Sequence, residues 1–142
     1  MISYIVNWDE LKKLLDKVFS GILVRDKTNI TGIPEILGDT ANIPAMVGDY
    51  TVASWRMTRT SILTGVTYAQ SGWKPEDMWE LSLNGDVIFS VYTKEMAERK
   101  SFQAIVPVNA GDTIIVTHKN ISGNSKQCWA DIELLHTTQG GN

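Results

Sequence analysis

The sequence predicts a mainly β protein, an antiparallel two-sheet sandwich of the jelly-roll type with one short α-helix near its N-terminus. First, 38 of the 142 residues are Ile, Val or Thr, and β-branched side chains fit a pleated sheet better than a helix. Second, about seven runs of alternating apolar and polar residues follow residue 50, separated by turn residues, as in all-β sandwiches. Third, no helical segments lie between these runs, which excludes a doubly wound parallel sheet.

The chain divides into three parts. Residues 1–49 are expected to hold the helix and an extended arm, for oligomerisation or anchoring. Residues 50–136 are expected to form the sandwich, and residues 137–142 are polar and Gly-rich, which is typical of a flexible tail. The length suits one ordinary domain that buries a core without disulfides or metals.

Residues 8–20 predict the helix. Asn7 is a suitable N-cap, and Gly21 is a suitable C-terminal stop. Apolar residues recur on one side at spacings of three and four, the helical period; they are Leu11, Leu14, Leu15 and Val18. Because so short a helix is marginal in isolation, this side must pack on the protein's own sandwich, on a second copy or on another partner.

Residues 33–48 show no sustained period. Two Pro and two Gly interrupt the segment, yet it is rich in apolar residues, unlike a solvated linker. The segment is either a packed loop with short strands or an extended arm that joins one subunit to another.

The later segments alternate with a period of two. Asn84-Gly85 between two such runs predicts a tight β-hairpin, because both turn residues need positive φ. Residues 93–101 are charged and are expected to form a helical turn or an exposed loop. In the last strand, Cys128 is expected to face the core and Trp129 to face outward. The expected strands are residues 50–58, 61–69, 79–83, 87–92, 102–108, 113–119 and 126–136.

Charge and composition exclude several classes of protein. The 13 Lys and Arg against 16 Asp and Glu give a net charge of -3, so we expect no nucleic-acid binding through bulk positive charge. No apolar run approaches the roughly 18 residues of a membrane-spanning helix, and the first residues lack the pattern of a secretory signal. The single cysteine, Cys128, excludes an intrachain disulfide and fits synthesis in a reducing host cytoplasm.

The sequence holds no convincing catalytic or metal-binding set. Cys128 and His136 are eight residues apart on one expected strand, too far for a nucleophile and its base, and Cys128 reaches His118 only in a particular strand register. Asp131 and Glu133 share a strand face, but no calcium-loop motif is present. We therefore expect no enzyme activity, no cofactor and no metal.

Two tryptophans are candidates for a binding surface. Trp73 lies in a segment with the composition of a loop, and Trp129 is expected to face outward from the last strand. Exposed indoles beside amides and carboxylates can stack on sugar rings. They can equally fill a contact between subunits, since Trp is enriched at protein interfaces, and this interpretation is preferred.

Four segments carry a resemblance to a known group of proteins. They are residues 79–85 (WELSLNG), 92–95 (YTKE), 110–114 (AGDTI) and 120–133 (NISGNSKQCWADIE). Together they resemble β-sandwich proteins of tailed-phage particles, such as head-decoration, head-fibre or tail-associated modules. Similar Gly-Asp turns occur in trimeric sandwiches of the complement and tumour-necrosis type and in carbohydrate-binding modules. The resemblance implies no catalytic residue.

These observations favour a non-enzymatic structural protein of a phage particle. It is expected to self-associate, as a homotrimer, and to dock on other virion proteins of the capsid or tail, with no nucleic-acid or membrane partner. Its expected location is the virion. The alternative is a carbohydrate-binding β-sandwich module that recognises a surface glycan through Trp73 and Trp129.

Overall fold

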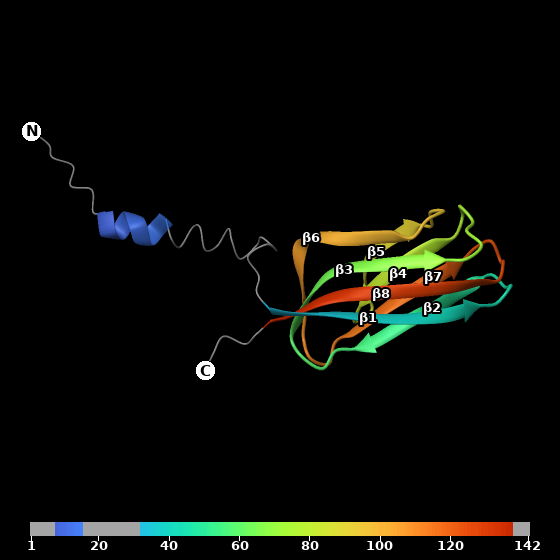
Figure 1. Ribbon diagram of the computed structural model, residues 1–142, viewed down its shortest axis with the longest axis horizontal. Helices are drawn as coiled ribbons and strands as arrows, with labels where there is room; N and C mark the ends of the chain where they lie inside the picture. Colours follow the sequence, from blue (N-terminus) through green and yellow to red (C-terminus); the bar gives the residue numbers. More distant parts are fainter. Residues whose placement is uncertain (1–7, 16–31, 138–142) are drawn as a thin grey trace, which may run out of the picture.

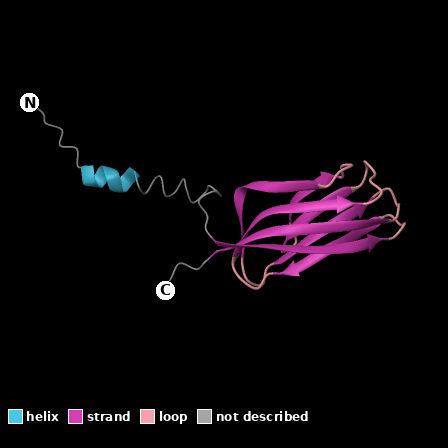
Figure 2. Cartoon of the chain, in the orientation of Figure 1, coloured by secondary structure: helices cyan, strands magenta, loops and turns pink. Residues whose placement is uncertain are grey.

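The protein is mainly β, as the computed structural model shows for residues 8–15 and 32–137, the residues that the structure describes (Figure 1). Residues 8–15 form a helix, and the rest of the described chain is a β-sandwich with short connecting loops (Figure 2). The strands are β1 (Gly32–Ile43), β2 (Gly48–Arg56), β3 (Ser61–Gln70), β4 (Met78–Leu83), β5 (Asp86–Tyr92), β6 (Glu98–Val108), β7 (Thr113–Asn120) and β8 (Lys126–Thr137).

The strands form two four-stranded sheets, in the orders β1-β8-β3-β6 and β2-β7-β4-β5. All neighbouring strands are antiparallel. Successive strands alternate between the two sheets, except that β4 and β5 are neighbours in one sheet. Eight strands connected in this way form a jelly roll. The predicted fold class, an antiparallel sandwich with a short N-terminal helix, is confirmed.

The core lies between the two sheets, because alternate residues of each strand point inward. On β8, Cys128 and Ile132 are fully buried, whereas Trp129 points outward and is 41% exposed. On β4, Trp79 and Leu81 are fully buried. The facing directions that the period of two predicted for β8 are therefore confirmed.

The Asn84-Gly85 hairpin is also confirmed, as the turn between β4 and β5. Both residues have positive φ, 52° for Asn84 and 86° for Gly85. Asn84 Oδ1 accepts a hydrogen bond from the backbone N–H of Thr113 at 2.9 Å, and its Nδ2 donates to Asp112 Oδ1 at 2.9 Å. The turn that reverses β4 is thus joined to the turn that precedes β7.

The sandwich begins earlier in the chain than the sequence predicted. Residues 32–43, expected to belong to an arm outside the sandwich, are the edge strand β1, which pairs with β8 from Gly32–Thr137 to Ile43–Lys126. The alternation is hidden because Ile36 lies on the outward face, opposite Glu133, while Leu37 lies on the inward face, opposite Ile132. The domain boundary expected at residue 50 therefore lies at Gly32 or before it.

The charged segment 93–101 is neither a helical turn nor wholly a loop. Only residues 93–97 connect the strands, and β6 begins at Glu98. Charged residues are compatible with this position because β6 lies at the edge of its sheet, and charges on an edge strand discourage pairing with another chain. One of them, Arg99, pairs with Glu133 of β8 through Nε and Oε2 at 2.7 Å.

The sandwich has two distinct ends (Figure 1). β1 begins and β8 ends at one of them, called here the terminal end. The opposite end, called here the loop end, carries four connections, residues 44–47, 71–77, 93–97 and 121–125. The polar residues that the sandwich buries lie mainly at these two ends.

Candidate functional site

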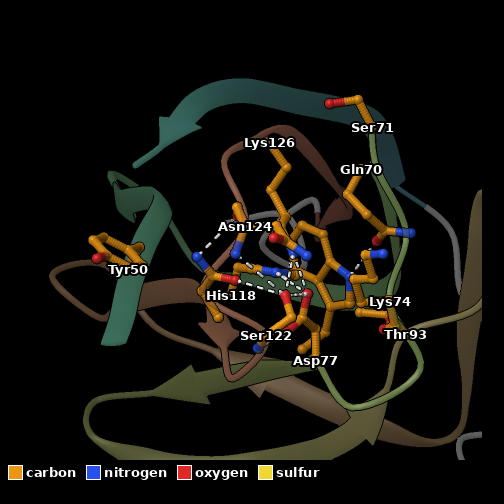
Figure 3. Close-up of polar contacts among 12 residues, drawn as sticks. Tyr50, Gln70, Ser71, Lys74, Asp77, Thr93, His118, Ser122, Asn124 and Lys126 are labelled. Carbon is orange, nitrogen blue, oxygen red and sulfur yellow. Dashed lines mark hydrogen bonds and ion pairs between the residues drawn. The ribbon is translucent and has the colours of Figure 1, made fainter. Parts of the chain in front are cut away.

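A buried ion pair lies beneath the loop end. Asp77, the residue before β4, contacts Lys126, the first residue of β8, through Oδ2 and Nζ (Figure 3). Their side chains are 1% and 0% exposed. Ser122 completes the arrangement, because its backbone N–H and its hydroxyl donate to the two carboxylate oxygens at 2.8 and 3.0 Å. Buried charges require such partners, since each loses its hydration.

The pair holds its charges inside the protein. Burial by itself raises the pKa of Asp77, but the hydrogen bonds from Lys126 and Ser122 outweigh this effect and hold the pKa below its ordinary value. His118 Nε2 lies 3.7 Å from Asp77 Oδ2, and its ring packs edge-on against Trp79 with centroids 4.8 Å apart. Burial, and then the positive charge of Lys126, lower the pKa of His118 to about 4. The imidazole is therefore neutral at pH 7.

This neutral histidine predicts a pH-dependent stability. Between its ordinary pKa of 6.5 and its pKa of about 4 in the folded protein, the unfolded chain binds a proton that the folded chain does not. The free energy of unfolding should therefore fall as the pH is lowered through this range. Asp77 adds to the loss below its ordinary pKa of 3.8. There the unfolded chain binds a proton at this carboxylate, while the folded protein keeps the carboxylate ionised.

Urea unfolding at about pH 7, 6 and 5 measures this dependence. The matched variant is His118→Gln, which removes the titrating ring from the same position and should flatten the dependence between pH 7 and pH 5. If the variant and the parent lose stability equally over this range, His118 is not the group responsible.

Hydrogen bonds around the pair join the four loops of the loop end to one another. Asn120 Nδ2 donates to the backbone oxygens of Pro44, Met46 and Asn124, each at 3.1 Å. These bonds connect residues 44–47 with residues 121–125. The bonds between Asp77 and Ser122 then connect residues 121–125 with residues 71–77.

The fourth loop is joined through Thr93. Its backbone N–H donates to Asp77 O at 2.9 Å, and its hydroxyl donates to Lys74 O at 2.5 Å. Gln70 Nε2 also reaches this loop, at Lys94 O, while its Oε1 accepts a hydrogen bond from Trp79 Nε1 at 2.7 Å. The polar cluster thus fixes the loop end as one connected surface.

That surface presents apolar side chains from all four loops. They are Met46 (62% exposed), Val47 (66%), Trp73 (38%), Met96 (80%) and Ile121 (48%). Side chains of this kind, supported from below by buried hydrogen bonds, suit a contact with a macromolecule. The titratable groups beneath them, Asp77, His118 and Lys126, are buried.

A second polar group lies at the terminal end and has the order of a catalytic triad. Ser61 Oγ is 2.5 Å from His136 Nδ1, and His136 Nε2 is 3.0 Å from Glu35 Oε1. Ser61 is only 1% exposed, and its hydroxyl also donates to Arg59 O at 3.1 Å. A nucleophile must contact its substrate, so this group is best explained as a structural connection of β3, β8 and β1.

The helix exposes the leucines that the sequence singled out. Leu14 and Leu15 are 58% and 45% exposed, and Trp8 on the same helix is 73% exposed. Leu11 is partly buried. Val18, the fourth member of the predicted apolar side, lies outside the described residues.

Trp73 and Trp129 are both exposed, and both lie close to one junction in the chain. Trp73 is in a loop, as expected, and Trp129 lies on the outer face of its sheet, opposite Thr40 of β1 and Ala69 of β3. The backbone groups of Ser71 and Gln127 are joined by a hydrogen bond from Ser71 N to Gln127 O at 2.9 Å. Each tryptophan is two residues along the chain from this junction.

The other groups weighed from the sequence have structural surroundings. Cys128 is fully buried, as expected for a core thiol, and burial raises its pKa to about 12. Glu133 pairs with Arg99, and Asp112 accepts hydrogen bonds from Asn84 and from the backbone of Asn109. Within residues 8–15 and 32–137, no group of three or more His, Cys, Asp and Glu could hold a metal ion.

Sequence reasoning missed the polar cluster of Asp77 and Lys126 and weighed His118 only as a partner for Cys128. His118 and Lys126 lie in phase with apolar residues of their strands, Ile114 and Val116 in one case and Cys128 in the other. This shared phase is the signal in the sequence that both side chains are buried, since it places them on the inward face of their strands. It does not reveal that the partner of Lys126 is Asp77, which is 49 residues away in the chain.

Comparisons with known proteins give a family and several distant structural neighbours. A family model described as "Domain of unknown function (DUF8551)" matches residues 31–139. The chain is similar in structure to FlhE, with 12% sequence identity and a TM-score of 0.45, over 72% of this chain and 98% of that chain. It is also similar to a GH26-CBM35 β-(1,4)-mannanase of Podospora anserina, with 18% identity and a TM-score of 0.39, over 78% of this chain and 29% of that chain.

Neither structural similarity is strong enough to carry a functional argument. A search of curated protein sequences finds no match. Among the described residues, no helix is long and apolar enough to cross a membrane.

Proposed function

We propose that this chain, which belongs to the DUF8551 family, is a non-enzymatic structural protein of a phage particle that self-associates and docks on other virion proteins. The helices are expected to associate in threes. The helix near the N-terminus holds the copies together, and the jelly-roll body makes the contacts with the particle. The resemblance of residues 79–85, 92–95, 110–114 and 120–133 to β-sandwich modules of tailed phages favours this setting.

One observation carries the proposal: the helix leaves its large apolar side chains exposed. Leu14 and Leu15 are 58% and 45% exposed within the described chain. Helices that expose a leucine side bury it against a partner, and a second copy of the same helix supplies a matching surface. The buried polar clusters of the body add support, because they give it rigid ends and leave no exposed nucleophile in the sites described above.

The test is the double variant Leu14→Gln/Leu15→Gln, followed by light scattering. Glutamine keeps the helix propensity high and removes the apolar contact. We expect the mass to fall below that of the unaltered protein, with an unchanged far-UV circular dichroism spectrum. The matched control is Lys12→Gln/Lys13→Gln, which introduces two glutamines into the same helix without removing a leucine and should leave the mass unchanged. Equal masses for the two double variants would remove the helix from the proposal.

A second candidate function is glycan binding by the same body. It is favoured by the position of Trp73 and Trp129, each two residues from the Ser71–Gln127 junction. Around Trp129, the same sheet face carries Thr40 and Gln127, whose side chains meet at 3.5 Å. An indole beside hydroxyl and amide groups is a suitable platform for a sugar ring.

A glycan array tests this candidate. Trp73→Ala and Trp129→Ala should each abolish the signal while the midpoint of thermal unfolding falls only slightly, since both side chains lie at the surface, 38% and 41% exposed. Trp8→Ala, in the helix, is the matched control and should bind like the unaltered protein. An array with no signal for the unaltered protein would reject glycan binding.

A further inference from the structure

The sandwich has four edge strands, and they differ in how well they are protected. β1 and β6 lie at the edges of one sheet, and β2 and β5 at the edges of the other. An edge strand presents unpaired backbone N–H and C=O groups, and proteins protect such edges with charges, prolines, glycines and bulges. The sequence of each edge strand therefore indicates which edge is kept free for a partner.

Three edges carry several protecting features. β1 contains Pro34, Glu35 and Asp39. β2 contains Asp49 and Arg56 and has a bulge after Thr51. The features of β6 are three consecutive charged residues at its start and a proline near its end: Glu98, Arg99, Lys100 and Pro107.

β5 lacks these features over its second half, Phe89–Tyr92. After Asp86, its residues Val87–Tyr92 include no charge, no proline and no glycine. β5 has its own bulge, at Ile88 opposite Leu81 and Ser82; this bulge lies close to the hairpin turn and leaves Phe89–Tyr92 in regular pairing with β4. In the described part of the chain, β5 pairs with β4 alone.

The side chains of β5 are also incompletely covered. Val87 and Tyr92 are 54% and 62% exposed. Ile88, Phe89 and Val91 pack against the core but are only partly buried, at the margin where the two sheets end. The Phe89 ring lies 6.4 Å from Phe102 of β6 and 6.1 Å from Tyr68 of β3. A further strand beside β5 would remove this apolar margin from water.

We infer that β5 is a strand-pairing edge and that its partner is β5 of a second copy of this chain. An antiparallel pair of identical strands is related by a twofold axis, so the donors and acceptors of one edge match those of the other. The partner must also be uncharged, because a charged strand would place unpaired charges beside Val87–Tyr92. β5 is the described edge strand that best meets this condition, and pairing would join two sheets into one continuous sheet.

This inference rests on the proposed self-association, and it assigns a contact separate from the helix. Twofold pairing through β5 and threefold bundling through the helix would give assemblies larger than a trimer for the unaltered chain. Removing one contact should therefore leave the other. That independence makes the two contacts separable in one set of variants.

The test uses the full chain carrying Leu14→Gln/Leu15→Gln, which removes the helix contact, and measures mass by light scattering. We expect two copies per particle in this background. Adding Val87→Lys/Tyr92→Lys should reduce the mass to one copy. The matched control adds Ile33→Lys/Ile36→Lys instead, at exposures of 54% and 67% on the edge strand β1, and should leave two copies.

The outcomes separate the two contacts. A single copy in the helix-variant background at all concentrations would overturn the β5 inference and leave the helix contact standing. Equal mass for the β5 and β1 lysine variants would also overturn it. A helix variant with the mass of the unaltered chain would instead contradict the proposed role of the helix. Circular dichroism of each variant shows whether the sandwich remains folded.

Discussion

Replacing Lys126 with Met is expected to lower the free energy of unfolding by about 3–5 kcal/mol, the usual effect of removing one partner of a buried ion pair. The reason is that Asp77, with a side chain only 1% exposed, would keep its charge without a cation or become protonated. Urea unfolding at pH 7 measures the change. So large a loss is a substantial fraction of the stability of a small domain, which is about 5–15 kcal/mol.

Two further variants make this expectation specific. Lys74→Met changes an exposed lysine on a loop that the same cluster joins, and should alter stability by no more than about 0.5 kcal/mol. Adding Asp77→Asn to Lys126→Met removes the unpaired charge and keeps an oxygen for Ser122, so it should restore part of the loss. If Lys126→Met is as mild as Lys74→Met, the ion pair does not hold the loop end together.

Trp79→Ala is expected to lower the free energy of unfolding by about 3–5 kcal/mol, the range for removing a large aromatic side chain from a core. Trp79 is fully buried. Its ring packs 5.1 Å from Tyr68 and 4.8 Å from His118, and its Nε1 donates to Gln70. The substitution therefore leaves a cavity and an unpaired amide oxygen together.

The matched control for this core residue is Trp129→Ala. It removes the same side chain from the outer face of the sandwich, where Trp129 is 41% exposed. Thermal unfolding of the two variants should show a large fall in midpoint for Trp79→Ala and a small one for Trp129→Ala. Similar falls would mean that the core does not depend on the packing described for Trp79.

The sequence predicted the parts of the fold that depend on neighbouring residues. The hairpin at Asn84-Gly85 follows from the backbone requirements of a two-residue turn. The faces of β8 follow from alternation within one strand. In contrast, β1 was assigned to an arm because Ile36, on its outward face, masks the alternation, and its strand state depends on pairing with β8 nearly one hundred residues away in the chain.

The same distinction applies to the sites. The exposed position of Trp129 was predictable, since it follows from the phase of a single strand. The clusters of Asp77, His118 and Lys126, and of Ser61, His136 and Glu35, join residues from separate strands and loops. Their members meet through strand order and register, which residue spacing along the chain does not specify.

Light scattering of the purified, unaltered chain over a range of concentrations tests the central claim most directly. The claim is that this jelly roll functions by associating with copies of itself and with other proteins. We predict a stable assembly with a mass several times the 15.8 kDa of one chain. A single chain at every concentration, with the far-UV spectrum of a folded β protein, would contradict the claim.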